Sequence, residues 1–407
     1  MSQSKIKVVW ICHLSNDEIQ SLLPLRKHIE EFAPWNPNFL KGFENEVNVE
    51  FHIISPHNYL IKPTKLFLRN INYYFIPFGI PIIHRHWPRF FRMDIFVNFY
   101  FFRKKVKKIV NSIKPDLINL IGAENSYYSS SILDFTHDYP VLILIQGFIS
   151  EFKDQPHKSF ELKNRIYIEE KILTTYKYFS GEQDSANYTS TYNSNYIFYK
   201  VYFPVNELLV SKTIDKGKRY DCIYFGRLEK SKGCEDFIKV ISEIKKQKLD
   251  VKGCIIGSGD LNPLKSLAKQ LNCYDNIEFV GFVNSQTELF EYVKASKVFL
   301  APPYNERLSS TIREAMLLRV PIVAYATGGI PYINEFDEHI YLVKTGNYKE
   351  MAKRTIQLLL NENLALKLTD KAYNFAINEF SLKVNMERLL KAYYSILNYT
   401  DKDKYGL

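Results

Sequence analysis

The chain has 407 residues, 46% of them hydrophobic and 24% charged, a globular composition too long for one ordinary hydrophobic core. Its net charge of +10 is concentrated in residues 84–114, where nine Lys/Arg accompany one acid, and the remainder is nearly balanced. We expect a cytoplasmic protein, because no apolar run approaches the roughly 18 residues of a spanning helix, the N-terminus lacks a signal-peptide layout, and five scattered cysteines argue against a disulfide framework or a zinc ribbon.

The N-terminal half alternates apolar runs with helical patterns. Short apolar runs that end in polar residues predict buried strands at 5–11, 47–54, 117–121 and 141–145. Because helical patterns lie between these strands, the sequence predicts a doubly wound α/β domain with right-handed crossovers.

A second series of the same kind begins near Lys218. Strands are expected at 221–225, 251–256, 276–280, 298–301 and 322–324. Helices are expected at 234–247, 264–271, 285–295, 310–318 and 349–360, with a polar linker at 205–217 and a final amphipathic helix at 382–397. Two such domains leave a cleft at the carboxyl ends of their strands, where these folds bind ligands.

A turn rich in cations, Gly226 to Gly233 (GRLEKSKG), directly follows the first strand of the second series. Gly226 would let the chain turn sharply as it leaves the sheet. Arg227 as a bidentate donor and Lys232 as a point charge suit a diphosphate. A charged surface turn is the alternative interpretation.

Residues 302–316 (PPYNERLSSTIREAM) lead from a strand into a helix. Ser309 or Ser310 can cap this helix, and Thr311 with Glu314 fits a capping box. A helix N-terminus in the cleft would also present free backbone N–H groups to an anion.

Two carboxylates lie on either side of that helix start. Glu306 precedes the helix and Glu314 lies in its second turn, so the pair could reach two different hydroxyl groups of one ligand. The alternative is that Glu314 only caps the helix and Glu306 is a solvated loop acid.

Two further turns contain glycine pairs. Gly257 and Gly259 follow the predicted strand 251–256, and Gly328-Gly329 follows 322–324. Each pair permits close approach of the backbone to a ligand, or is merely a turn.

The order and spacing of these four motifs over 225–331 resemble the retaining glycosyltransferases of family 4, which have the GT-B fold. The family pattern is G-R-L-x-x-x-K-G, then G-x-G, then two glutamates eight apart followed by A-M, then P-x-V-A and G-G. The resemblance implies α/β architecture with two Rossmann-like doubly wound domains facing a cleft. It implies an acceptor-binding domain at 1–205, a nucleotide-sugar-binding domain at 206–381, and a helix at 382–407 that crosses back to the first domain.

The resemblance also implies roles by position. Arg227 and Lys232 would hold the donor diphosphate, Glu314 the ribose hydroxyls and Glu306 the transferred sugar, with backbone amides of 308–310 completing the cradle. The implied donor-binding residues are Gly226, Arg227, Lys232, Gly257, Gly259, Leu308, Ser309, Ser310 and Glu314. The implied catalytic residues are Glu306 and Gln146.

Gln146 follows the predicted strand 141–145, where many family members carry a histidine that touches the donor sugar. Glutamine can hydrogen-bond a hydroxyl but cannot take a proton. A retaining transfer whose base is the departing phosphate oxygen tolerates this, because it needs mainly positioning and charge stabilisation. Alternatively, Gln146 is only a strand-end residue.

The chain departs from the family at several positions. Arg307 and Ser309 stand where glycines usually follow the first glutamate, Tyr332 stands at a common glutamate, and Val320 replaces a glycine. These departures keep open a nucleotide-sugar epimerase on the same fold and a non-catalytic donor-binding subunit.

The expected activity is a metal-independent, retaining transfer of a hexosyl-type sugar, without a cofactor. The co-substrate would be a UDP- or GDP-linked sugar and the acceptor a lipid-linked glycan in surface polysaccharide biosynthesis.

The basic segment 84–114 contains a helical stripe of apolar residues that is expected to be core rather than membrane contact. The stripe is Ile95, Phe99, Phe102, Val106, Ile109 and Ile113. A basic face of Arg103 and lysines 104, 105, 107 and 108, with nearby aromatic residues, predicts peripheral contact with an anionic membrane, at its inner face. A solvated helix is the alternative. Nucleic acid is not expected as a partner, because no nucleic-acid fold motif accompanies the segment. His84 and His86 are not expected to bind a metal, because they lack the nearby acids of a metal site.

Overall fold

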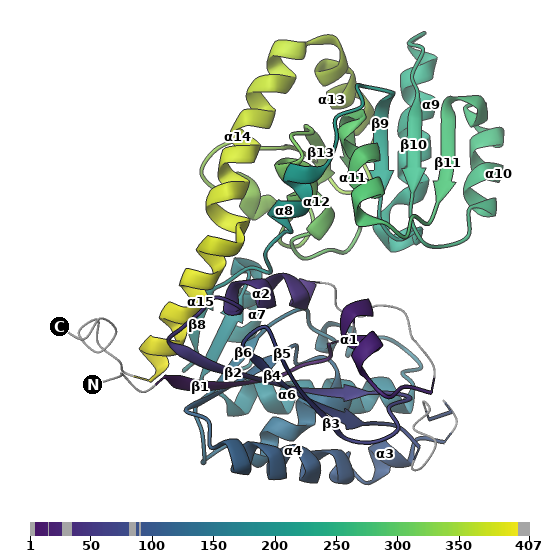
Figure 1. The fold of residues 1–407 in the computed structure, drawn as a ribbon. Helices are drawn as coiled ribbons and strands as arrows, with labels where there is room; N and C mark the ends of the chain where they lie inside the picture. The colour runs from purple at the N-terminus through teal and green to yellow at the C-terminus, as the bar shows by residue number, and fades with distance from the viewer. Residues whose placement is uncertain (1–4, 15, 27–34, 81–86, 89–90, 398–407) are drawn as a thin grey trace. The chain divides into compact units, whose positions relative to one another are not determined.

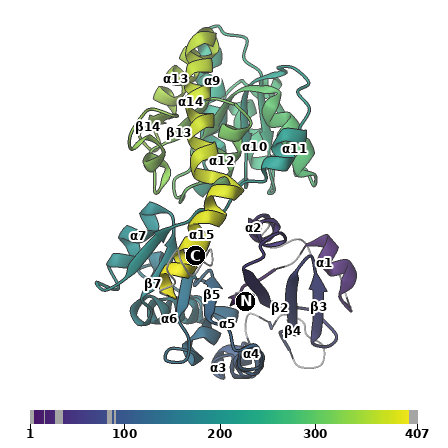
Figure 2. The ribbon, with the colours of Figure 1, turned by 60° about the vertical axis from the view of Figure 1, so that its left-hand side comes forward.

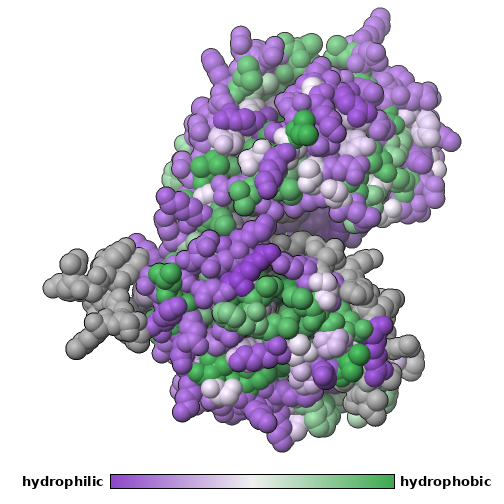
Figure 3. All heavy atoms as spheres, in the orientation of Figure 1, coloured by the Kyte–Doolittle hydropathy of each residue, from purple (hydrophilic) through white to green (hydrophobic). Residues whose placement is uncertain are grey.

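The computed structural model describes residues 5–14, 16–26, 35–80, 87–88 and 91–397. The chain divides into two compact units: residues up to Pro204 together with those from Leu382, and Val205–Ser381 (Figure 1). Across the described residues no helix is both long and apolar enough to cross a membrane. The face drawn in Figure 3 mixes hydrophilic atoms with scattered hydrophobic ones.

The N-terminal unit is built on an eight-stranded sheet of order β3-β4-β2-β1-β5-β6-β7-β8. All neighbours are parallel except β3 and β4. The strands are β1 Ile6–Ile11, β2 Val49–His57, β3 Thr64–Leu68, β4 Ile71–Pro77, β5 Leu117–Ile121, β6 Val141–Leu144, β7 Tyr178–Gly181 and β8 Ile197–Lys200.

Helices cover both faces of this sheet (Figures 1 and 2). They are α1 Asp17–Leu22, α2 Trp35–Phe43, α3 Met93–Phe96, α4 Tyr100–Ile113, α5 Ser126–Ser129, α6 Phe160–Thr175, α7 Gln183–Ser190 and α15 Leu382–Ile396. One face packs on α2 and α15, while α4, α5 and α6 pack on the other. The apolar stripe of the basic segment is therefore core, as predicted, although Asn98 and Phe99 at positive φ break it into the two helices α3 and α4.

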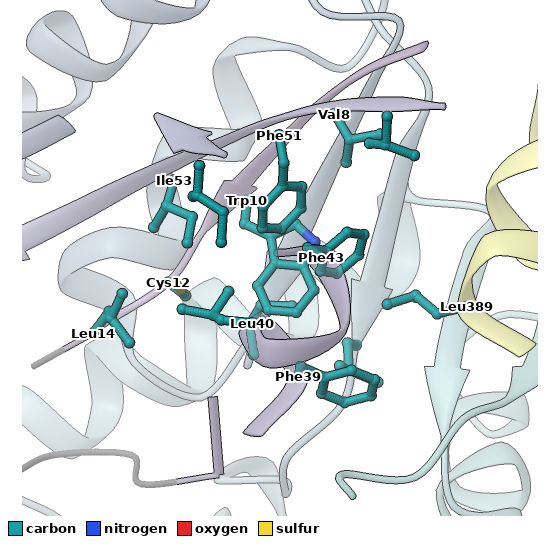
Figure 4. Close-up of a cluster of buried hydrophobic side chains, with 14 of the residues drawn as sticks. Val8, Trp10, Cys12, Leu14, Phe39, Leu40, Phe43, Phe51, Ile53 and Leu389 are labelled. Carbon is teal, nitrogen blue, oxygen red and sulfur yellow. The ribbon is translucent and has the colours of Figure 1, made fainter. Parts of the chain in front are cut away.

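Trp10 is the centre of the core between the sheet, α2 and α15 (Figure 4). Its ring makes edge contacts with Phe39, Phe43 and Phe51 at centroid distances of 5.9, 5.6 and 5.1 Å. Leu389 of α15 joins the same cluster. Helix α15 is therefore part of this core although it follows the whole second unit in the sequence.

The C-terminal unit has a six-stranded, wholly parallel sheet of order β11-β10-β9-β12-β13-β14. Its strands are β9 Tyr220–Phe225, β10 Gly253–Ile256, β11 Ile277–Gly281, β12 Ser296–Ala301, β13 Ile322–Tyr325 and β14 Tyr341–Val343. Its helices are α8 Glu207–Lys212, α9 Cys234–Lys246, α10 Asn262–Gln270, α11 Gln286–Lys294, α12 Ser310–Leu317, α13 Tyr348–Leu360 and α14 Glu362–Phe380. Short 3-10 helices lie at Ser130–Asp134, Ser150–Phe152, Lys230–Lys232, Tyr274–Asn276 and Ile330–Asn334.

The α/β fold class is confirmed, and each strand expected from an apolar run is present. Strands β3, β4, β7, β8 and β14 were not predicted. The last three have only three or four residues, too few to establish a period. The predicted linker at 205–217 contains helix α8, whose Asn206 side chain caps it by accepting from the Leu209 N–H.

A buried hydrogen-bond chain links α15 to the sheet. The Trp10 Nε1–H donates to the Tyr393 hydroxyl at 2.7 Å, and that hydroxyl donates to Asn119 Oδ1 at 2.7 Å. Tyr393→Phe would leave a buried donor and a buried acceptor without this partner, so we expect the free energy of unfolding to fall by about 1–3 kcal/mol.

Urea unfolding followed by tryptophan fluorescence measures this loss selectively, because Trp10, Trp35 and Trp87 all belong to the N-terminal unit. Tyr167→Phe, at an exposed tyrosine of α6, is the matched control and should leave the midpoint unchanged. An unchanged midpoint for Tyr393→Phe would show that the hydroxyl does not stabilise the unit.

Candidate active site

The predicted donor-binding residues gather at one edge of the C-terminal sheet. Strands β10, β9, β12 and β13 are consecutive neighbours, and the loops that carry the four motifs follow their carboxyl ends. In parallel sheets this edge is the usual ligand-binding side.

The loops after β9 and β10 are joined backbone to backbone. The Gly226 N–H donates to the Ile256 carbonyl at 3.0 Å, and the Leu228 N–H donates to the Ser258 carbonyl at 2.8 Å. A Cβ on Gly257 would lie 1.7 Å from the Gly226 carbonyl oxygen, so only glycine permits this approach. The G-x-G turn thus holds the cationic turn in place.

Lys232 and Glu306 form an ion pair with 2.8 Å between Lys232 Nζ and Glu306 Oε2. Their side chains are only 19% and 21% exposed. The backbone of Gly328 lies against that of Glu306. Only glycine permits this approach, because a Cβ at position 328 would lie 1.7 Å from the Glu306 carbonyl oxygen. The structure therefore brings together the cationic turn after β9, the loop before α12 and the glycine-pair turn after β13.

Arg227 is placed differently from Lys232. Its guanidinium pairs with Glu229 at 3.0 Å, and the side chain is 60% exposed. A pair this exposed contributes little to stability, so Arg227 can exchange Glu229 for another anion at small cost.

The capping box predicted for α12 is wrong. Ser309 occupies the N-cap position, but its side chain makes no capping bond and instead bonds the Thr311 hydroxyl at 2.7 Å. Glu314 does not reach back to the cap and accepts a hydrogen bond from Gln286 Nε2 at 3.3 Å. Ser310, the first helical residue, is exposed, whereas Leu308 is buried.

Two charged groups near the start of α12 are partly desolvated. Burial raises the pKa of Glu314 to about 7, against a weaker lowering by Arg313. Burial also lowers the pKa of Arg307 to about 10, so this arginine remains cationic at neutral pH. A cation thus replaces the usual glycine directly after Glu306.

A buried carboxylate, Asp236 of α9, anchors the loop that carries Glu306. Asp236 Oδ2 accepts from the hydroxyls of Tyr304 at 2.6 Å and Tyr325 at 2.7 Å, and Oδ1 pairs with Lys239 at 2.7 Å. The Tyr304 N–H also donates to the Ser231 carbonyl at 2.8 Å. Asp236 therefore couples three motif-bearing segments through one side chain.

Gln146 lies in the N-terminal unit, at the carboxyl end of β6. It flanks Gly122 together with Glu124: a Cβ on Gly122 would lie 2.8 Å from Gln146 Oε1 and 2.8 Å from both carboxylate oxygens of Glu124. Burial raises the pKa of Glu124 to about 7. Nearby, His13 Nδ1 and the Tyr127 hydroxyl are hydrogen-bonded at 2.7 Å.

Sequence reasoning did not identify Asp236, Tyr325 or Gln286 as parts of the site. Asp236 lies in the first turn of a predicted helix, where an acid ordinarily complements the helix dipole, so no pattern distinguished it. Its role follows only from contacts over 68 and 89 residues.

Among the described residues, no group of three or more His, Cys, Asp or Glu side chains is arranged to hold a metal ion. His84 and His86 lie outside the described residues.

Residues 207–375 match the family model of the group 1 glycosyl transferases. This part of the chain is similar to that family. The match covers the whole candidate donor site, including the Lys232–Glu306 pair and Glu314. It confirms the resemblance to glycosyltransferases, whereas membership of family 4 stays a prediction.

An uncharacterised glycosyltransferase of Haemophilus influenzae is 30% identical over 169 residues, which are 41% of this chain and 47% of that protein. CapM of Staphylococcus aureus, a capsular polysaccharide biosynthesis glycosyltransferase, is 25% identical over 175 residues, 43% of this chain and 46% of that one. The chain thus spans about half the length of the curated relatives it matches.

Sucrose-phosphate synthase of Thermosynechococcus elongatus has a similar fold, with a TM-score of 0.74 at 14% identity, over 97% of this chain and 100% of that one. This likeness confirms the predicted GT-B fold class.

The raised pKa of Glu314 predicts a pH-dependent stability. The folded state holds this proton up to pH about 7 and the unfolded chain only to about 4.5, so the free energy of unfolding should fall as pH rises between these values. Glu314→Gln removes this titration. We expect the variant to gain stability relative to the wild type across that window, by about 3 kcal/mol in total.

Hydrogen exchange of strand peptides from β9 and β12 measures the difference, because intrinsic exchange rates cancel between the two proteins at each pH. Glu338→Gln, at an exposed acid of the same unit, is the matched control. A constant difference from pH 4.5 to 7 would contradict the predicted ionisation.

Removing the charge of Asp236 should loosen the loop that it anchors. Asp236→Asn retains the volume but weakens three hydrogen bonds to a charged acceptor, each worth about 1.5–3 kcal/mol. We expect faster hydrogen exchange in the peptide covering 302–309, with little change in strands of the N-terminal unit. Asp250→Asn, at an exposed aspartate of the same unit, should leave exchange in 302–309 as in the wild type.

Proposed function

We propose that the protein is a retaining, metal-independent glycosyltransferase that moves a sugar from a UDP- or GDP-linked donor to a glycan acceptor. The observation that carries this proposal is the Lys232–Glu306 pair, which lies beside the uncapped start of α12 within the region that matches the model of the group 1 glycosyl transferases.

The donor diphosphate would replace carboxylates as the partner of two cations. Lys232 would release Glu306 and Arg227 would release Glu229, and each would pair with a phosphate oxygen instead. The first N–H groups of α12 favour the same negative charge, since Ser309 does not cap them. Phosphate binding would thereby free Glu306 to accept hydrogen bonds from the sugar hydroxyls.

Glu314 suits the ribose of the donor. A carboxylate can accept hydrogen bonds from two neighbouring hydroxyls, which would replace the single bond from Gln286. These bonds would favour the ionised form and offset the desolvation that raises its pKa. Gly257 and Gly259 would lie near the base.

The transfer needs no side chain as a base. The acceptor oxygen would form a bond to the anomeric carbon on the face from which the diphosphate leaves, the bond to the phosphate oxygen would break, and that oxygen would take the acceptor proton. Lys232, Arg227 and the α12 amides would stabilise the negative charge of the leaving diphosphate. Gln146 would hold a hydroxyl by hydrogen bonding, a role that requires no proton transfer.

A lipid-linked glycan for a surface polysaccharide is the acceptor class we propose. CapM, which is similar over 43% of this chain, is named for capsular polysaccharide biosynthesis, and this favours such a pathway. Residues 1–205 would bind the acceptor, with Glu124 and Gln146 at the carboxyl edge of the sheet. The protein would work in the cytoplasm at the inner face of the membrane.

Transfer of labelled sugar tests the donor site. We expect Glu306→Ala, Lys232→Ala and Arg227→Ala each to lower kcat/KM by about 100-fold or more, because each removes a charged contact to the donor. Lys230→Ala is the matched control, since this lysine of the same turn is 89% exposed and 3.8 Å from Glu235. Equal turnover in all variants would reject the assigned site.

The same assay separates the alternatives. A retained anomeric configuration and unchanged rates in EDTA are expected for the proposed mechanism, whereas inversion or loss of activity in EDTA would contradict it. An epimerase would convert the nucleotide sugar without an acceptor. A non-catalytic subunit, kept open by Arg307, Ser309 and Tyr332, would bind donor in calorimetry and transfer nothing.

A further inference from the structure

Helix α4 divides its side chains between two faces. Phe102, Val106 and Val110 are buried in the core of the N-terminal unit. At 100° per residue, the side chains that project away from this core include four exposed lysines and two exposed aromatic residues of the first turn. These six residues are Tyr100, Phe101, Lys104, Lys105, Lys107 and Lys108.

Large apolar side chains continue this surface over α3 and the start of α6. Phe96 and Phe101 are 70% and 67% exposed, although phenylalanine is ordinarily buried. Phe160 of α6 stacks on Phe96 at a centroid distance of 4.9 Å and is itself 49% exposed. Figure 3 shows hydrophobic atoms among hydrophilic ones along the edge of the unit where α3 and α4 lie in Figure 1.

Arginines pair with the acids around this surface and join the helices that form it. Arg92 makes two hydrogen bonds to Asp94, at 2.9 and 2.8 Å, and pairs with Glu161 at 2.7 Å, which ties α3 to α6. Arg103 donates to both carboxylate oxygens of Asp134, through Nε and Nη2. In the described part of the chain, no carboxylate pairs with the four lysines of α4, so the surface keeps their positive charge.

We propose that this surface, formed by α3, the outer face of α4 and Phe160, docks the protein on an anionic lipid bilayer. Phe96, Phe101 and Phe160 enter the headgroup region, and the lysines contact lipid phosphates and carboxylates. Aromatic residues beside lysines on an outward helix face suit such an interface. The inference stands whether or not the proposed transfer reaction is correct, because it rests only on these exposed side chains.

Other partners fit this surface less well. A two-fold contact with a second copy would set the four lysines of one α4 against those of the other, and like charges repel. A nucleic acid would engage the lysines through its phosphates but would leave the exposed phenylalanines in water. The lipid bilayer is the partner that satisfies both the charge and the apolar side chains.

Vesicle sedimentation of the full chain tests the proposal. We expect binding to vesicles of phosphatidylcholine with phosphatidylglycerol and none to phosphatidylcholine alone. Changing lysines 104, 105, 107 and 108 to Gln should weaken binding by about 100-fold or more, since each basic group near an anionic surface contributes several-fold. The double variant Phe96→Ser, Phe101→Ser should weaken binding at constant charge.

Matched controls keep these results specific. Changing Lys248, Lys349, Lys353 and Lys367 to Gln alters the net charge equally at exposed lysines of the other unit and should preserve binding, as should Phe282→Ser with Phe336→Ser. Tryptophan fluorescence checks that the N-terminal unit of each variant is folded. Wild-type affinity in the α4 lysine variant, absence of wild-type binding to anionic vesicles, or a dimer that the Phe96 and Phe101 changes dissociate without altering vesicle binding would each overturn the proposal.

Discussion

The ion pair between Lys232 and Glu306 is the contact on which the candidate donor site depends. It joins the turn after β9 to the loop before α12, two segments that are 74 residues apart in the chain. Other contacts fix the backbone of each partner. Lys232 lies in a turn that is hydrogen-bonded to the G-x-G loop. The Glu306 carbonyl packs closely against Gly328, and the nearby Tyr304 hydroxyl donates to Asp236. The pair keeps two opposite charges satisfied, and under the proposed function a donor phosphate would take the place of Glu306.

Desolvation has a common effect at the edges of both sheets. Glu314 in one unit and Glu124 in the other have a pKa raised to about 7 because burial disfavours the carboxylate. A carboxyl poised in this way gains most from hydroxyl donors, which restore the hydrogen bonds that water would have made. Sugars and ribose offer such donors in quantity. The two partly buried acids therefore fit a protein that binds polyhydroxylated ligands, although they lie in separate units of the chain.

The residues that the motifs mark lie close together where a local motif determines backbone geometry, and their binding roles stay predictions. Gly226, Gly257 and Gly259 lie in turns that are joined backbone to backbone, and Glu306 forms an ion pair with Lys232. Local reasoning was wrong at the start of α12, where the capping-box pattern is present but the Ser309 hydroxyl bonds Thr311. The sequence pattern predicts which side chains could cap the helix. Whether one of them does depends on other hydroxyl groups nearby that compete for the same hydrogen bond.

The sequence by itself determined the two α/β series, their buried strands and the four motif turns, because hydrophobic period and glycine positions act within a few residues. Only the tertiary structure decided what distant segments share. In the folded protein α15 packs against Trp10, and Asp236 accepts hydrogen bonds from Tyr304 and Tyr325. Phe160 stacks on the exposed Phe96. These contacts depend on how whole sheets and helices pack, and no spacing of residues along the chain encodes them in readable form.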